Sequence, residues 1–555
     1  MRVRRTNKGL RVQAISGTYV VLLGFDLPEN ACNGFLGFSI HRTDHTENEA
    51  YYMKGMKMFE KTNPGFPQGS LYSTQYHPWQ SYQWADYSAK PDHSYTYTIT
   101  ALKGSPESLT SIAVTKIKIQ TEKVENEVHN IFFNRGISAS QEYVRRFGDT
   151  KPKVSDSPDS PVLSWLSRGL YEALVKFVSD CIPGKDTLRI CAYEFHYKPF
   201  LQLIKKTIDK GVDIKILYDE RKTSPGDKNK ETIAECGLAA FCIPRKNGKS
   251  YISHNKFIVK ITNGKPVSVW TGGTNFSMGG IFGHSNVAHL FNDDLVAQKF
   301  FDYWNALQID PTSAAIKTVT EQISPLPDIS LNNTETCIFS PRKNSDALHL
   351  YQLFALSAKK GLFMTFAFGM NEVFKNVYNT SLADLRFSLL EKKTRPLKEG
   401  SDERKAEEEE IDQLRFKPEN IFAIGDLIKK TNQIDGWVRE SLSNLNKNVQ
   451  YVHNKFMLVD PLSKNPLVIT GSANFSEAST TENDENMVII RKNTRVADIY
   501  LGEFMRLYSH HAFRESLQWR NTNDAPKFLK TDNWWKDYYS DHSRSFRRLY
   551  FSKSE

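Results

Sequence analysis

An internal repeat constrains the fold of this 555-residue chain more than any other feature. The tetrapeptide "HNKF" begins at His254 and returns at His453. A gapless alignment of residues 254–277 with 453–476 gives 11 identities in 24 positions, and the distance from the histidine to the asparagine of "NFS" is 21 in both (275 − 254 and 474 − 453). Repetition at fixed spacing indicates one structural unit present twice. We therefore expect a duplicated domain.

The residues before each tetrapeptide predict the class of that domain. "TLRICAYEF", "YKPFLQLIKKTIDKG" and "VDIKILYDE" fit a buried strand, a helix and a second strand. The second copy offers "KGLFMTFAF", "NEVFKNVYNTS" and "LRFSLLEKK" in the same order. A strand–helix–strand order indicates an α/β fold. We expect two α/β half-domains with mixed sheets, packed about a pseudo-twofold axis.

The first 122 residues have a different pattern. Short runs such as "TYVVLLGFDL" and "HSYTYTITAL" are separated by Pro, Gly, Asn and Asp, which predicts an all-β antiparallel sandwich. Tyr95 and Tyr97 alternate with threonines in a way that resembles the sixth strand of fibronectin type III domains. Such a domain is more often a docking or spacer unit than a catalytic one. It could bind a protein partner or help to select a substrate.

These patterns give a provisional domain division. A charged segment at 391–420 is expected to be a solvated helix or a mobile insertion without a catalytic role. The C-terminal "DNWWKDYYSDHSRSFRRLYF" could stack bases and bind phosphates, or could pack its aromatic residues onto a preceding domain. The expected units are the sandwich at 1–122, half-domain 1 at 160–325, half-domain 2 at 326–515 including the insertion, and an aromatic and basic tail at 516–555.

Composition limits the environment and the partners. The formal net charge of +10 is compatible with nucleic acid, with an anionic membrane surface, or with an ordinary protein surface. The six cysteines form no CxxC pair, which favours reduced thiols and no zinc site. No apolar run approaches the length of about 20 residues that spans a membrane, and the N-terminal run "YVVLLGF" is too short for a signal peptide. We expect a cytoplasmic location.

The repeated motif carries a specific chemistry. Residues two apart on a strand face the same side, so His254 projects with Lys256, and His453 with Lys455. The following "TGGTNFS" and "TGSANFS" are expected to present Asn275, Ser472 and Asn474 from tight turns. Lysines and amides can stabilise charge on a phosphoryl group, while one histidine attacks phosphorus and the other protonates the leaving oxygen. This set needs no metal or cofactor.

The duplicated H-x-K with a later G-[GS]-x-N resembles the phospholipase D superfamily over residues 165–515. That resemblance implies a hydrolase of the phosphodiesterase class in which two half-sites form one active site, with a covalent phosphohistidine intermediate. The second copy matches the family pattern at His453, Lys455, Asp460, Gly471, Ser472, Asn474 and Glu485. The first copy departs from it, with Ile261 for the aspartate, Gly273 for the serine, and Ala288 where an acidic residue is expected.

The resemblance leaves the roles of the histidines open. It implies His254 as the nucleophile and His453 as the general acid, but the roles reverse if Glu485 orients His453. Asp460 and Gly273 are expected to be supporting residues. Glu194 and His196 could line the cleft, although a loop histidine is more often satisfied by backbone groups. The neighbours His510 and His511 face different ways on a predicted helix, so they do not form a metal pair.

Three functions remain open at this point. The first is a nuclease or another nucleic-acid phosphodiesterase, which the net basicity slightly favours. The second is a phospholipase D that acts on phosphatidyl lipids. The third is an inactive binding or effector module with a decayed first half-site. Since one chain holds both halves, a monomer is sufficient for a complete site.

Overall fold

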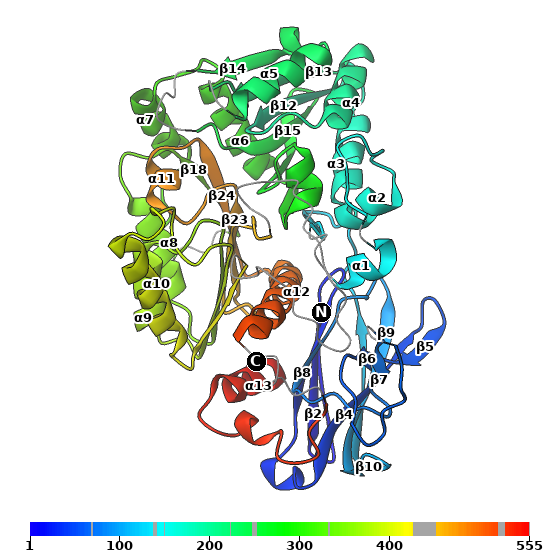
Figure 1. Cartoon of the computed structure of the whole chain (residues 1–555). Helices are drawn as coiled ribbons and strands as arrows, with labels where there is room; N and C mark the ends of the chain where they lie inside the picture. The colour runs from blue at the N-terminus through cyan, green and yellow to red at the C-terminus, as the bar shows by residue number, and fades with distance from the viewer. Residues whose placement is uncertain are drawn as a thin grey trace.

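The computed structural model describes residues 1–67, 70–136, 141–148, 150–221, 224–246, 252–330, 334–425, 451–519 and 528–553. An N-terminal antiparallel β region is followed by two α/β halves (Figure 1). The predicted fold class is confirmed. Within the described residues, no helix is both long enough and apolar enough to cross a membrane.

The N-terminal region contains two four-stranded antiparallel sheets around one aromatic core. In β9 every second residue from Tyr95 to Ala101 is buried, as a half-buried strand requires. The hydroxyl oxygen of Tyr95 accepts a hydrogen bond from the Lys90 N–H (2.9 Å). Likeness to fibronectin type III stays a prediction. The strands are β1 (Arg2–Asn7), β2 (Leu10–Ser16), β3 (Val21–Asp26) and β8 (Gln83–Asp86) in one sheet, β10 (Ser108–Gln120), β9 (Ser94–Ser105), β4 (Phe35–Asp44) and β5 (Glu49–Tyr52) in the other, and the small pair β6 (Lys54–Gly55) and β7 (Tyr72–Ser73).

The two α/β halves each contain a seven-stranded mixed sheet with the same strand order. Counted along the chain within each half, that order is 1-7-6-5-2-3-4 in both. Strands 2, 3 and 4 are parallel, and the remaining pairs are antiparallel. The first sheet is β11 (His129–Phe133), β17 (Val287–Phe291), β16 (Lys265–Gly272), β15 (Lys256–Thr262), β12 (Asp186–Ala192), β13 (Asp213–Asp219) and β14 (Cys242–Arg245). The second is β18 (Glu335–Ser340), β24 (Glu485–Arg491), β23 (Leu467–Gly471), β22 (Phe456–Val459), β19 (Gly361–Phe366), β20 (Leu385–Leu390) and β21 (Asn420–Ile424).

Helices connect and cover these strands. The helix α10 lies between the third and fourth strands of its half, the position that α5 has in the first half. The charged segment therefore contains the repeat's own helix, and Ile411 and Leu414 on that helix are buried. The first half contains α1 (Gln141–Phe147), α2 (Pro161–Ser167), α3 (Leu170–Ser179), α4 (Lys198–Asp209), α5 (Gly226–Glu235), α6 (Asp294–Leu307) and α7 (Ser313–Ile323). The second contains α8 (Asp346–Leu356), α9 (Glu372–Thr380), α10 (Asp402–Arg415), α11 (Glu477–Thr481) and α12 (Thr494–Trp519).

Two equivalent contacts join the halves. Ser253 forms a parallel bridge with Asp484, and Val452 forms one with Ser285. The partners correspond, because 452 − 253 and 484 − 285 are both 199, which is also the offset between the two HNKF motifs. The halves are thus related by a pseudo-twofold axis that brings the segment before each motif against the other half.

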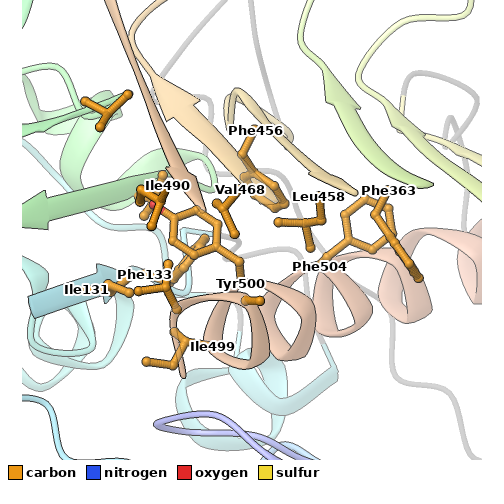
Figure 2. Close-up of a cluster of buried hydrophobic side chains, with 14 of the residues drawn as sticks. Ile131, Phe133, Phe363, Phe456, Leu458, Val468, Ile490, Ile499, Tyr500 and Phe504 are labelled. Atoms are coloured by element: carbon orange, nitrogen blue, oxygen red, sulfur yellow. The ribbon is translucent and has the colours of Figure 1, made fainter. Parts of the chain in front are cut away.

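The long helix α12 lies under this junction. Its Tyr500 and Phe504 pack against Phe456 of the second sheet, and Tyr500 also packs against Phe133 of β11 (Figure 2). The same core cluster includes Val20 of the N-terminal region. One apolar core is therefore shared by the sandwich and both halves, which holds the two sheets in a fixed relation.

The C-terminal segment returns to the sandwich. Trp534 is buried among Phe35 and Tyr82, and its indole N–H donates to the Phe35 carbonyl (2.9 Å). In α13 (Ser543–Lys553), Phe551 lies so close to β3 that a Cβ added at Gly24 would be 2.1 Å from its carbonyl oxygen. These aromatic residues therefore pack onto the N-terminal sandwich. This is the second of the two roles expected for the C-terminal segment, the first being to stack bases.

Candidate active site

The two HNK motifs lie at the start of equivalent strands and are buried. His254 lies two residues before β15 and His453 three residues before β22, and only 6% and 5% of their surfaces are exposed. The Lys256 and Lys455 amines each donate to the carbonyl oxygen of the histidine two residues before. Both lysines are 1% exposed. Each lysine amine thus lies against the backbone of its own histidine.

The partner of His254 comes from the other half. Its Nδ1 lies 2.8 Å from Glu485 Oε1, at the start of β24. The second carboxylate oxygen of Glu485 accepts a hydrogen bond from the Ser472 hydroxyl (2.7 Å). Ser472 thus holds the carboxylate in place. A carboxylate on Nδ1 leaves the other ring nitrogen, Nε2, for chemistry.

The partner of His453 also comes from the other half, but it is neutral. His453 Nδ1 lies 2.9 Å from Asn286 Oδ1, and Asn286 Nδ2 donates to the Gly280 carbonyl (2.7 Å). Because Nδ2 is used in this way, Oδ1 faces the imidazole and accepts its Nδ1–H. Asn286 and Glu485 are equivalent, since 485 − 286 is also 199.

The expectation that Ala288 occupies the acidic position is wrong. Ala288 pairs with Gly272 in the first sheet, as Met487 pairs with Gly471 in the second. Ala288 is thus the counterpart of Met487, two residues past the position that faces a histidine. Asn286 was missed because the sequence alone does not give the strand register, although the constant offset of 199 points to it.

The turn residues lie beside these pairs. A Cβ added at Gly273 would be 3.1 Å from Asn286 Oδ1 and 3.4 Å from the His453 carbonyl oxygen. At the equivalent position of the second half, the Ser472 hydroxyl bonds to Glu485, so Gly273 leaves Asn286 without the corresponding hydrogen bond. The Oδ1 atoms of Asn275 and Asn474 have no hydrogen-bond partner among the described residues.

Burial dominates the electrostatics of the site. It lowers the pKa of His254 well below its usual value, with Lys256 and Lys455 adding to the effect, and it lowers the pKa of His453 likewise. It also lowers the pKa of Lys256 to about 8 and raises the pKa of Glu485 to about 8. Burial therefore disfavours the charged forms of both histidines and of Glu485.

Two acidic residues that the sequence analysis did not single out fix the motifs. Asp219, at the end of β13, accepts from the Ser253 N–H (3.1 Å), and Glu391, directly after β20, accepts from the Val452 N–H (2.7 Å). Each holds the residue before a candidate histidine. An acidic residue after the second strand of both repeats, in "ILYDE" and "SLLEKK", is the signal that could have identified them.

Asp460 is placed outside the site. Its carboxylate accepts from the N–H groups of Lys359, Lys360 and Gly361 at 2.7–3.1 Å, where β19 begins. It therefore stabilises the sheet. Its counterpart Ile261 lies in the apolar core.

Three further residues named from the sequence have other surroundings. Glu194 accepts a hydrogen bond from the Ser277 hydroxyl. The His196 backbone N–H donates to the Phe276 carbonyl (3.2 Å). His511 is fully buried in α12, where burial lowers its pKa to about 3.

Among the residues that the structure describes, the groups that could together hold a metal ion lie away from this site. Within the described ranges, one group of three potential ligands is close enough to hold an ion, and it lies in the sandwich at Asp44, Glu47 and His93. Asp44 already accepts from His93 (2.8 Å) and from two backbone N–H groups, while Lys90 donates to Glu47. These hydrogen bonds account for the cluster without a metal.

Comparison with known families agrees with the repeated architecture. Residues 180–307 and 362–508 match the family model described as "Cardiolipin synthase, PLD-like domain". Both α/β halves are PLD-like. The matched segments contain both HNK motifs, and β11 and β18 lie outside them.

Several solved structures are similar to part of this chain. Phosphatidylserine synthase from Haemophilus influenzae is 12% identical, with 62% of this chain and 85% of that chain covered and a TM-score of 0.44. The yeast tyrosyl-DNA phosphodiesterase is 12% identical, with 56% and 85% covered and a TM-score of 0.34. The phospholipase D family member Nuc from Salmonella typhimurium is 27% identical, with 24% and 84% covered and a TM-score of 0.20. No curated protein matches the chain in sequence.

Proposed function

We propose that the chain is a phosphodiesterase of the phospholipase D superfamily that works through a covalent phosphohistidine. The observation that carries the proposal is the pair of cross-half contacts, His254 with Glu485 and His453 with Asn286. Each half supplies one histidine and the partner of the other histidine. A site built in this way needs both halves and offers two imidazoles in different environments.

The difference between the partners supports separate roles. When Nε2 of neutral His254 attacks phosphorus, a P–N bond forms, the P–O ester bond breaks, and the ring becomes cationic. Glu485 faces that new charge and stabilises it. His453 enters this step in its protonated form, which the negative charge of the bound phosphodiester favours, and gives its Nε2 proton to the leaving oxygen. This assigns His254 as nucleophile and His453 as general acid.

The second step reverses these transfers. Neutral His453 takes a proton from water, the water oxygen bonds to phosphorus, and the P–N bond breaks. His254 returns to its neutral form and His453 to its protonated form. Lys256 and Lys455, with Asn275 and Asn474, stabilise the phosphoryl oxygens, since cations and N–H donors favour the charge that builds there.

We propose nucleic acid as the substrate class. The net charge of +10 favours a polyanionic phosphodiester through the electrostatic attraction that dominates nucleic-acid affinity. Phosphatidyl lipid is the alternative that the experiment must separate. The sandwich is proposed to hold a protein partner or the far part of the substrate.

The test is a panel of labelled DNA, labelled RNA and phosphatidylcholine vesicles in EDTA, with bis-p-nitrophenyl phosphate as a small reporter. We expect cleavage by the wild type that His254→Ala and His453→Ala each abolish, together with an acid-labile phosphohistidine trapped at His254. Cleavage of lipid alone would overturn the choice of substrate. No cleavage of any of these, with His254→Ala indistinguishable from wild type, would overturn the proposed activity.

A further inference from the structure

The pseudo-symmetry of the PLD-like halves is broken on one side of the candidate site. The last residue of β12, Ala192, pairs with Lys256. In the second half, Met364 pairs with Met457, and extending that register by two residues sets Phe366 opposite Lys455. Ala192 and Phe366 are therefore equivalent, and α4 and α9 both begin six residues later. The loops that follow can be compared position by position.

In the first half, this loop closes against the turn that carries Asn275. Phe195 forms a parallel bridge with Phe276, and Glu194 accepts a hydrogen bond from Ser277. The Tyr193 ring lies 4.8 Å from the His254 ring and 5.0 Å from the Lys256 amine. Large side chains thus fill the space beside the first histidine.

In the second half, the equivalent loop leaves that space open. The counterparts of Tyr193, Glu194 and Phe195 are Ala367, Phe368 and Gly369. No bridge forms between Gly369 and Phe475, which lie within the described part of the chain. A pocket of about 80 Å³ remains, and Ala367, Gly369, Asn474 and Phe475 are among the residues that line it.

The backbone keeps the pocket open. Gly369 has φ +81°, and a Cβ there would lie 2.5 Å from the Arg395 backbone nitrogen. A larger residue at this position would meet both backbone strain and a steric clash. The first half has Phe195 at the equivalent position, so the opening is specific to the second half.

The pocket's walls define what it can hold. Phe366 and Phe475 are buried and apolar. The charged residue that lines it, Arg395, is paired with Glu372 and Glu407, and no carboxylate is among the lining residues. An ammonium group would lose its hydration there without a counter-ion. Since a water occupies about 30 Å³ of liquid, 80 Å³ fits a group of a few non-hydrogen atoms.

We infer that this pocket is a substrate subsite for a compact, uncharged, apolar part of one substituent on the phosphodiester, next to Asn474 in the second half. The inference rests on the proposed phosphodiesterase activity and adds a preference among the substituents of the phosphodiester. Tyr193 and Phe195 exclude such a group from the first half, so the substituent is expected to bind on the side of the second half. Ala367 and Gly369 are the residues that determine its size limit.

The test uses p-nitrophenyl phosphodiesters that share a leaving group and differ in the second ester. Burying a methylene raises kcat/KM by about fourfold, so kcat/KM for the isopropyl ester, which has two more carbons, should exceed that for the methyl ester by about fifteenfold. The series Ala367→Val, Ala367→Leu and Ala367→Tyr should lower this ratio stepwise to near one, mainly through KM. The exposed Ala314→Leu on α7 is the matched control and should keep the wild-type ratio.

A second pair of substrates tests charge at constant size. The propyl ester should be cleaved at least tenfold better than the 2-aminoethyl ester, which has an ammonium in place of the terminal methyl. Equal or reversed preference in the wild type, or an isopropyl-to-methyl ratio that the Ala367 series does not change, would overturn the inference. If no ester were cleaved, or if His254→Ala and His453→Ala cleaved every ester as the wild type does, the proposed function itself would be refuted. The two failures are therefore distinguishable.

Discussion

The unequal partners of the two histidines predict unequal losses on mutation. Glu485→Gln keeps the size of the side chain but removes the charge that faces the His254 ring when it becomes cationic. The contacts are almost the same length, 2.8 Å for Glu485 and 2.9 Å for Asn286, so charge is the main difference. A hydrogen bond to a charged group contributes about 1.5–3 kcal/mol, and one between neutral groups about 0.5–1.5 kcal/mol.

These values convert to rates at about 1.4 kcal/mol for each factor of ten. Glu485→Ala, which removes the bond altogether, should therefore lower kcat/KM by about 10- to 150-fold, and Asn286→Ala by about 2- to 13-fold. Glu485→Gln, which keeps a neutral hydrogen bond, should lie between the wild type and Glu485→Ala. The assay is bis-p-nitrophenyl phosphate hydrolysis in EDTA, with thermal unfolding of each variant to confirm that it folds. Equal losses for the two alanine variants, or a loss below threefold for Glu485→Ala, would refute the assignment of roles.

Asn286→Asp provides the converse test of the same reasoning. A carboxylate behind His453 would favour its protonated form and raise its pKa, since an opposite charge at hydrogen-bond distance shifts a pKa by about 1–3 units. A general acid with a higher pKa stays protonated to higher pH. The alkaline limb of the kcat/KM profile should therefore move upward, and a limb that moved downward or stayed in place would count against His453 as the acid.

Three other predictions concern pH and stability. Because burial lowers the pKa of Lys256 to about 8, the amine loses its proton as pH rises through that value, so kcat/KM should fall there; a flat profile from pH 7 to 9 would contradict this. Asn255 donates to Tyr303 and accepts from Asn486, whereas its counterpart Asn454 has no side-chain partner among the described residues, so chemical denaturation should show Asn255→Ala losing about 1–3 kcal/mol of unfolding free energy and Asn454→Ala clearly less. Trp534→Ala should lose about 3–5 kcal/mol because the ring fills the sandwich core, and the half-buried Trp535→Ala should lose less; equal losses would show that the core packing is not the cause.

The sequence contained enough to predict the duplication and the α/β class. The gapless repeat fixed the equivalence of His254 with His453, and the structure brings these residues close to their lysines. It did not reveal that each histidine is held by the opposite half. Contacts between halves depend on how two sheets pack, and local patterns carry no information on that packing.

Other differences have local physical causes. Ala288 was predicted from the sequence to occupy the position that is acidic in the family. The residue that reaches His453 is Asn286, two positions earlier along the chain. The expected start of half-domain 1 at residue 160 leaves out β11, because a five-residue edge strand far from its sheet in sequence has no helical or alternating pattern to mark it. Part of the expected second half, residues 426–450, lies outside the described residues.

The exchange of partners across the axis also bears on why a single chain is used. If two identical copies of one half assembled into a dimer, any residue behind one histidine would also stand behind the other. Covalent linkage removes that constraint, so the position behind one imidazole can be an acid and the position behind the other an amide, as Glu485 and Asn286 are. Two equivalent histidines can thus take different roles when both halves belong to one chain, whereas an exactly symmetric dimer would give them the same surroundings.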